Sequence, residues 1–205
     1  MVYPKTFIKR EHSEDEHNKK NIYSCPQTLF KIHPDFDQII FDILEKDKKG
    51  IFYLIKDRNK VWYKKLIKRL SKNKKYDSKK IIFMDPLNYE DYLLHLGRSS
   101  VLLDPLYYGA GNSFFESMLF GTPTITFPTD YIKSRLVLGA YKQMEIKDPP
   151  IATSIQNYID LAVRYANRDD IRSLKSTYKT AAEKKLFNTK KAGEEFNKII
   201  INLFN

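Results

Sequence analysis

A segment with two glycines that follows a hydrophobic run has the composition of a phosphate-binding turn. Residues 102–116 read LLDPLYYGAGNSFFE. Pro105 ends the strand that we expect before it, and Gly109 and Gly111 let the backbone turn tightly and leave room for a ligand. Asn112 suits a helix N-cap, so the next turn offers free backbone N–H groups and the positive end of a helix dipole. The segment therefore predicts a site for a phosphate group.

Glu116 extends this prediction from a phosphate to a nucleotide. It stands four residues after Asn112, about one helical turn further on the same face. A carboxylate there can accept hydrogen bonds from the two hydroxyls of a ribose whose phosphates occupy the helix start. The spacing fits a nucleoside diphosphate, and the alternative is a structural turn followed by a solvated helix carboxylate.

Strand and helix patterns alternate along the chain and place this turn at the edge of a sheet. Five successive strand–helix pairs are typical of a parallel sheet with helices on both faces. This is an α/β Rossmann-like fold, which binds ligands at the carboxyl ends of its strands. Beyond residue 154 the pattern is helical only, with breaks near 167–170 and 187–189. The expected strands are 22–25, 50–55, 81–84, 100–104 and 123–127, and the expected helices are 34–46, 60–71, 89–96, 112–120 and 131–140.

Length and composition describe one globular domain. The chain has 205 residues, of which 42% are hydrophobic and 30% charged, as in soluble proteins. We expect residues 1–20 to be a flexible charged lead-in and residues 21–205 to form the domain, with a helical tail over about 154–205. No run approaches the roughly 20 apolar residues of a membrane span, and no signal peptide is evident. With Cys25 as its one cysteine, the chain is expected in the reducing cytoplasm.

One stretch of the chain supplies most of its net charge of +11. Residues 60–80 hold ten Lys or Arg and one acid, and Trp62, Leu66 and Leu70 recur among them at helical spacing. This pattern predicts an amphipathic helix with a solvated basic face, and the excess of lysine over arginine disfavours base readout in a nucleic-acid groove. A basic nucleic-acid-binding module remains an alternative. The side chains expected on that face are Lys64, Lys65, Lys68, Arg69 and Lys72.

Three ordered motifs resemble the O-linked N-acetylglucosamine transferase family, which includes bacterial relatives and the plant SPINDLY proteins. They are CPQTLFKIHP at 25–34, DPLYYGAGNSFFESMLFGTPTITFP at 104–128 followed by Ser134 and Arg135, and LFNT at 186–189. The likeness covers about residues 21–205. It implies the two-lobed GT-B glycosyltransferase fold, of which this chain matches the C-terminal, donor-binding lobe.

The resemblance also implies roles for individual residues. Gln27 and Lys31 belong to the family's glutamine and lysine motif, and Lys31 would contact the donor pyrophosphate as the catalytic cation. Tyr89 and His95 stand where the animal enzymes have basic residues, so the base, as in UDP or GDP, stays open. The implied donor-site residues are Gln27 and Lys31 of this motif, Leu87 and Tyr92 at the base, Gly109, Gly111, Asn112 and Ser113 at the phosphates, and Glu116 at the ribose.

The implied reaction moves a sugar from a UDP-sugar, with UDP-N-acetylglucosamine as the expected donor, to a Ser or Thr hydroxyl of a protein or peptide. No DxD-like acidic pair stands at a loop, so we expect a metal-independent reaction without a further cofactor. The acceptor groove would belong to a separate N-terminal lobe or a repeat-containing chain, and no membrane contact is expected. A nucleotide-binding or scaffold protein without catalysis is the competing hypothesis.

Overall fold

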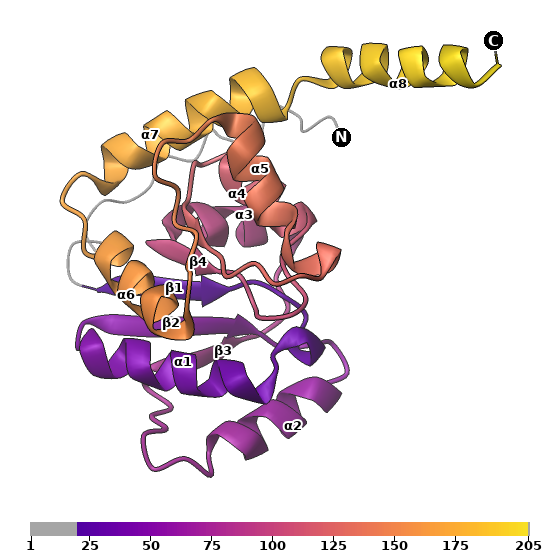
Figure 1. The fold of residues 1–205 in the computed structure, drawn as a ribbon. Coiled ribbons are helices and arrows are strands. Elements are labelled where there is room, and N and C mark those ends of the chain that lie inside the picture. Colours follow the sequence, from indigo (N-terminus) through magenta and orange to yellow (C-terminus); the bar gives the residue numbers. More distant parts are fainter. Residues whose placement is uncertain (1–19, 205) are drawn as a thin grey trace.

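The centre of the protein is a parallel sheet of five strands in the order β3-β2-β1-β4-β5 (Figure 1). The structure is a computed structural model and describes residues 20–204. Because β1 pairs with both β2 and β4, the sheet grows in opposite directions from β1, and a crevice at this point is where such sheets bind ligands. The strands are β1 (Asn21–Cys25), β2 (Gly50–Ile55), β3 (Ile81–Met84), β4 (Val101–Leu103) and β5 (Thr124–Ile125).

Helices connect the strands and cover both faces of the sheet. Along β4, Val101 and Leu103 pack with one set of helices, whereas Leu102 between them packs with Leu93 and Leu96 on the other face. This alternation is the period of a strand with two buried faces. The expected α/β fold is therefore confirmed. The connecting helices are α1 (Pro34–Lys46), α2 (Val61–Leu70), α3 (Tyr89–Arg98), α4 (Asn112–Met118) and α5 (Leu136–Met144), with short 3-10 turns η2 (Leu29–Lys31) and η3 (Ile132–Ser134).

Local sequence explains where α1 begins. The backbone N–H of Asp35 donates to Nδ1 of His33 at 3.2 Å, so His33 caps the helix, and Pro34 occupies its first turn. Asp35 and Asp37 add negative charge at the positive end of the helix dipole. His33 thus shapes this turn. The apolar positions recur at helical spacing and are buried: Phe36, Ile39, Ile40, Ile43 and Leu44.

The helical tail returns to the sheet and then leaves it. It consists of α6 (Ile155–Ala166), α7 (Ile171–Ala181), the π-helical turn η4 (Ala182–Leu186) and α8 (Thr189–Phe204). In Figure 1, α8 extends away from the rest of the chain. Gly121, with φ of 67°, lets α7 approach closely, because a Cβ there would lie 1.8 Å from the carbonyl oxygen of Lys175. The Lys175 ammonium group donates to Gly97 O (2.8 Å) and Ser99 O (2.7 Å), which ties α7 to the end of α3.

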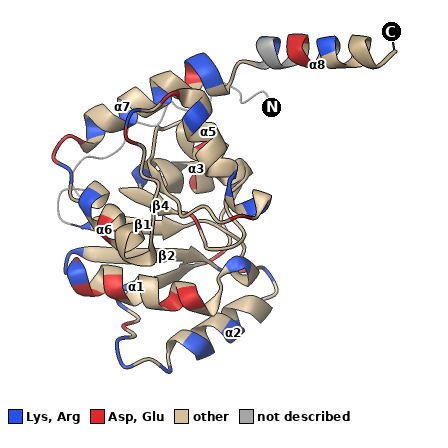
Figure 2. Ribbon diagram, in the orientation of Figure 1, with Lys and Arg blue, Asp and Glu red and all other residues tan. Residues whose placement is uncertain are grey.

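Two expectations about elements were wrong. The helix expected over 131–140 is divided into η3 and α5, because the Ser134 hydroxyl donates to Tyr131 O and accepts from the Thr129 N–H, which holds a tight loop there. Arg69 does not join the solvated face: its guanidinium group donates to both carboxylate oxygens of Asp37 at 2.6 and 2.8 Å. Lys64, Lys65, Lys68 and Lys72 are exposed as expected, and Figure 2 shows basic residues on α2 and acidic residues on α1.

The predicted lead-in lies outside the described residues except for Lys20. Across residues 20–204, no helix has the length and apolar character needed to cross a membrane.

His95 is packed inward against the sheet. Its Nε2 lies 2.6 Å from the hydroxyl oxygen of Ser24 on β1, and its ring contacts Tyr53 edge-on with centroids 5.4 Å apart. Burial and, to a smaller extent, the charge of Arg98 together lower the pKa of His95 to about 4. The imidazole is therefore neutral and structural in the folded protein at neutral pH.

Replacing His95 by Gln should weaken the acid sensitivity of the fold. An unfolded histidine binds a proton below about pH 6.5, whereas folded His95 does so only below about pH 4. Between these values the unfolded state holds more protons, so the free energy of unfolding decreases as the pH falls, by at most about 3 kcal/mol from this group. Urea denaturation at pH 7 and pH 4.5 should show a smaller decrease for His95→Gln than for wild type. Equal decreases would contradict this assignment.

Candidate functional site

Side chains that follow β1 and β4 join the two segments predicted to hold a diphosphate. Lys31 Nζ donates to Gln27 Oε1 at 2.9 Å and to the carbonyl oxygen of Gly109 at 3.3 Å. The Gln27 amide donates in turn to the Ser113 hydroxyl, and both Gln27 and Ser113 are buried. Gln27, Lys31, Gly109 and Ser113 therefore lie together at the carboxyl edge of the sheet, where its order reverses.

A buried carboxylate holds the turn between β4 and α4. Asp104 is 3% exposed; its Oδ1 accepts the N–H of Ala110 at 2.5 Å, and its Oδ2 accepts the hydroxyl of Thr126 at 2.7 Å. A Cβ on Gly109 would lie 2.9 Å from Oδ1, so only glycine lets the turn sit directly on this group. Burial raises the pKa of Asp104 to about 7, against the opposing hydrogen bonds from Thr126 and Ala110 and the charge of Lys31.

Two lysines and a tyrosine line the turn. Lys31 Nζ lies 4.3 Å from the centre of the Tyr108 ring, and Lys133 Nζ lies 5.4 Å from the same ring. The carbonyl oxygen of Lys133 also accepts the N–H of Gly109 at 2.9 Å. Burial lowers the pKa of Lys31, while the charge of Asp104 opposes this. The turn thus presents a half-buried cation and an exposed one to an anion.

The start of α4 differs by one residue from the expectation. Gly111, not Asn112, is the N-cap; Asn112 is the first helical residue, and its side chain is exposed and does not cap the helix. The helix begins one residue earlier because the carbonyl oxygen of Gly111 already accepts the N–H of Phe114. The N–H groups of Asn112 and Ser113 lie in the first turn, where no intrahelical acceptor exists. They remain the candidate donors to a phosphate.

Glu116 lies beside α3 at the next turn of α4. It is half-buried, and its Oε1 accepts a hydrogen bond from the Tyr89 hydroxyl at 3.3 Å. Tyr89 is exposed, so its hydroxyl group lies at the surface. The carboxylate is thus within reach of hydroxyl donors at the surface, and a ribose hydroxyl could replace that of Tyr89.

The residues predicted at the base lie on α3 and in the loop before it. Tyr92 is half-buried against the cluster of Leu93, Leu96 and Leu102 and stacks with Tyr89, with ring centroids 6.4 Å apart. Leu87 is half-exposed in the loop between β3 and α3. His95, in contrast, points to the sheet, so its ring has no place in a base pocket.

Asp104, Tyr108 and Lys133 contact the turn, although the sequence alone assigned them no role. Asp104 and Tyr108 stand inside the glycine-containing segment, and an acid at the end of a strand was the available signal. Lys133 follows β5, and nothing in its local sequence distinguishes it from other lysines. Within residues 20–204, no three His, Cys, Asp or Glu side chains gather as a metal site requires.

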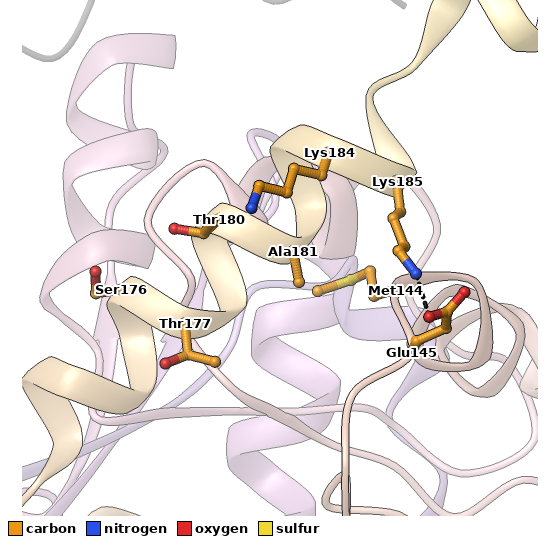
Figure 3. A pocket seen from close by; sticks show the side chains of 8 residues that line it. All are labelled: Met144, Glu145, Ser176, Thr177, Thr180, Ala181, Lys184 and Lys185. Carbon is orange, nitrogen blue, oxygen red and sulfur yellow. Dashed lines mark ion pairs between the residues drawn. The ribbon is translucent and has the colours of Figure 1, made fainter.

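A hollow of about 440 Å³ lies elsewhere, between α5 and α7 (Figure 3). Met144 and Glu145 line it at the end of α5, and Lys184 and Lys185 line it from η4, with Lys185 paired to Glu145. The start of α5 is at the other site, since Leu136 Cδ1 lies 4.0 Å from a Cβ placed on Gly111. A helix of this length separates the two by about 12 Å. The hollow is therefore not part of the predicted donor site.

Solved structures share this fold at low identity. A mutant of the Thermobaculum terrenum O-GlcNAc transferase is 18% identical with a TM-score of 0.71, covering 81% of this chain and 32% of that chain. TarM is 15% identical with a TM-score of 0.68, covering 91% of this chain and 35% of that chain. A mutant of S. aureus TarM in complex with fondaparinux, α-GlcNAc-glycerol and UDP is 16% identical with a TM-score of 0.64 and coverage of 91% and 36%.

The chain spans about a third of the length of these solved proteins. A comparison with curated proteins returned no match. The model of glycosyl transferase family 41, in contrast, matches residues 7–196, nearly the whole sequence. Together with a five-stranded parallel sheet and its helical tail, which form the C-terminal lobe of the GT-B fold, this match shows that the chain belongs to glycosyl transferase family 41.

Proposed function

We propose that this chain is the donor-binding lobe of a glycosyltransferase, with UDP-N-acetylglucosamine as donor and a protein Ser or Thr hydroxyl as acceptor. The observation that carries the proposal is the meeting of Gln27 and Lys31 with the turn from Gly109 to Ser113. Family membership supports glycosyl transfer. The choice of donor is supported by the O-GlcNAc transferase with this fold and by the TarM structure that contains UDP.

In this proposal the departing diphosphate is stabilised by the protein alone. Lys31 supplies a positive charge, and the N–H groups of Asn112 and Ser113 supply directed donors, where negative charge develops on the leaving oxygen. Glu116 receives the ribose hydroxyls, and Leu87 and Tyr92 border the base. No step needs a metal ion or a further cofactor, so donor binding should be the same in EDTA as in Mg²⁺.

A second lobe is part of the proposal, because the acceptor must reach the sugar from outside this chain. Exposed apolar and aromatic side chains gather where such a lobe would lie. Within residues 20–204, nine large ones follow the carboxyl ends of strands and six lie on α8. Burying such a surface against a partner is favourable. The nine are Phe30, Val61, Trp62, Tyr89, Tyr107, Tyr108, Tyr131, Ile132 and Leu136.

Replacing Lys31 by Met should weaken the binding of UDP far more than the binding of uridine. Met keeps the apolar stem over Tyr108 but removes the charge, and a charge-assisted hydrogen bond is worth about 1.5–3 kcal/mol, or roughly 10- to 150-fold in affinity. Titration calorimetry in EDTA measures both ligands. Lys64→Met, on the exposed face of α2, is the matched control and should leave both affinities unchanged. If the affinity for uridine falls as much as the affinity for UDP, Lys31 does not bind the phosphates.

Glu116→Gln should reduce the affinity for UDP by about 1–3 kcal/mol and that for 2′-deoxy-UDP by much less. Glutamine keeps the size of the side chain, but it accepts hydrogen bonds at one oxygen only and presents an amide donor in place of the other. The deoxy ligand already lacks one of the two contacts. The test titrates wild-type protein and Glu116→Gln with UDP and with 2′-deoxy-UDP and compares the four affinities.

Tyr89→Phe is the control for this test, because it keeps the Glu116 carboxylate and removes the hydroxyl that competes for it. Its affinity for UDP should equal or exceed that of wild type. Wild-type protein that binds the two ligands alike, with Glu116→Gln neutral for both, would disprove the ribose role.

A further inference from the structure

Asp104 is a buried charged group that the proposed reaction does not use. It follows β4 directly and lies beneath the turn that leads to α4. We propose that Asp104 is the positioning residue of the diphosphate site, and that its carboxyl group takes up a proton from solvent when a diphosphate binds above the turn. This inference rests on the proposed function, since it concerns the same site.

The geometry makes Asp104 the support of the turn. The N–H of Ala110 donates to Asp104 Oδ1 at 2.5 Å. Gly109 lies directly against the carboxylate, since a Cβ there would come within 3.0 Å of both carboxylate oxygens. From α6, the Tyr158 hydroxyl donates to the backbone carbonyl of Asp104 at 2.8 Å and fixes the backbone that carries the carboxylate. The carbonyl of Gly109 then accepts from Lys31. A movement of Asp104 would therefore move both the turn and the Lys31 contact.

The charge balance around Asp104 depends on Lys31. Lys31, on η2, is the cation that acts on Asp104, and Asp104 acts on Lys31 in return. From β1, α5 and α6 the carboxyl group faces the thiol of Cys25 and the phenols of Tyr141 and Tyr158. Burial raises the pKa of all three, so they are neutral near pH 7 and cannot compensate a negative charge.

Both protonation states of Asp104 keep their hydrogen bonds. The Ala110 N–H donates to Oδ1 in either state. The Thr126 hydroxyl donates to Oδ2 of the carboxylate, and it can rotate to accept from Oδ2–H of the neutral acid. Oδ1, Oδ2 and the Thr126 hydroxyl oxygen therefore each keep one hydrogen-bond partner when the protonation state changes.

Diphosphate binding changes this balance in one direction. Burial raises the pKa of Asp104 to about 7, with Lys31 as an opposing influence. A bound diphosphate adds negative charge nearby and compensates the positive charge of Lys31. Both changes raise the pKa of Asp104 further. A proton from the buffer must then bind, and by linkage the affinity for the diphosphate decreases as the pH rises above about 7.

Calorimetry with UDP-N-acetylglucosamine at pH 7.5 tests the proton uptake. This ligand has no terminal phosphate, whose second pKa near 6 would add its own titration. The slope of the observed binding enthalpy against buffer ionisation enthalpy gives the number of protons, expected to be roughly 0.5 or more for wild type. Asp104→Asn, which keeps the size and the Oδ1 acceptor, should bind with about half a proton less.

Asp47→Asn is the matched control, a second buried carboxylate at the amino end of the sheet. Burial opposes ionisation there, but hydrogen bonds from Tyr23 and Asn21 keep the pKa of Asp47 below its usual value. This variant should take up as many protons as wild type. A readout without any variant is ¹³C NMR of the Asp104 carboxyl in wild-type protein, whose titration midpoint near pH 7 should move up by about one pH unit when the ligand saturates.

The outcomes separate the two proposals. Binding of UDP-N-acetylglucosamine with no proton uptake, or with a carboxyl midpoint that the ligand does not move, overturns the role of Asp104 and leaves donor binding intact. Uptake that is equal in wild type and Asp104→Asn overturns it as well. No binding to wild-type protein overturns the proposed function, and the inference about Asp104 with it.

Discussion

The pairing of β1 with β4 is the constraint on which the site depends. Tyr23 pairs with Val101 and Ser24 with Leu102, so the ends of two strands that lie far apart in sequence become neighbours. Lys31 and Gly109 are 78 positions apart and yet share a hydrogen bond. The intervening chain forms β2 and β3 on the other side of β1, connected by α1, α2 and α3. Any register shift between β1 and β4 would separate the lysine from the turn.

The burial of a charged group has different consequences at Lys175 and at the predicted site. Lys175 is satisfied by the carbonyl oxygens of Gly97 and Ser99 and lies far along the tail from the site, so it serves the packing of α7. Burial lowers its pKa to about 8. Asp104 and Lys31 lie at the carboxyl edge, where an incoming anion can change their balance. A buried charge costs free energy unless it is paired, and perturbed groups in a crevice are typical of functional sites.

The sequence was sufficient for the strands and helices, the glycine turn and the family resemblance, because short apolar runs and helical spacing are local patterns. The apolar run of Val101, Leu102 and Leu103 and the positions of Gly109 and Gly111 needed no tertiary information. The cap of α4, in contrast, depends on the Gly111 carbonyl and the support from Asp104, which a propensity for Asn at N-caps does not contain.

Other features are tertiary and left no local signal. Arg69 looks like its neighbouring lysines in sequence, but Asp37 on α1 draws it inward. His95 occurs in a helix next to the predicted base site, and only the packing of α3 on β1 shows that it faces Ser24. Lys133 reaches Tyr108 because β5 and β4 are adjacent in the sheet. These contacts connect residues that no spacing rule relates.

The most direct test of the central claim is an NMR titration of ¹⁵N-labelled protein with UDP. Binding between the ends of β1 and β4 predicts that the backbone amide shifts concentrate in residues 27–31 and 107–116, with smaller changes near Tyr89 and Tyr92. Amides along α2 and around the hollow between α5 and α7 should stay unchanged. Shifts confined to α2 or to that hollow, or no shifts at all, would contradict the assignment of this edge of the sheet as a nucleotide site.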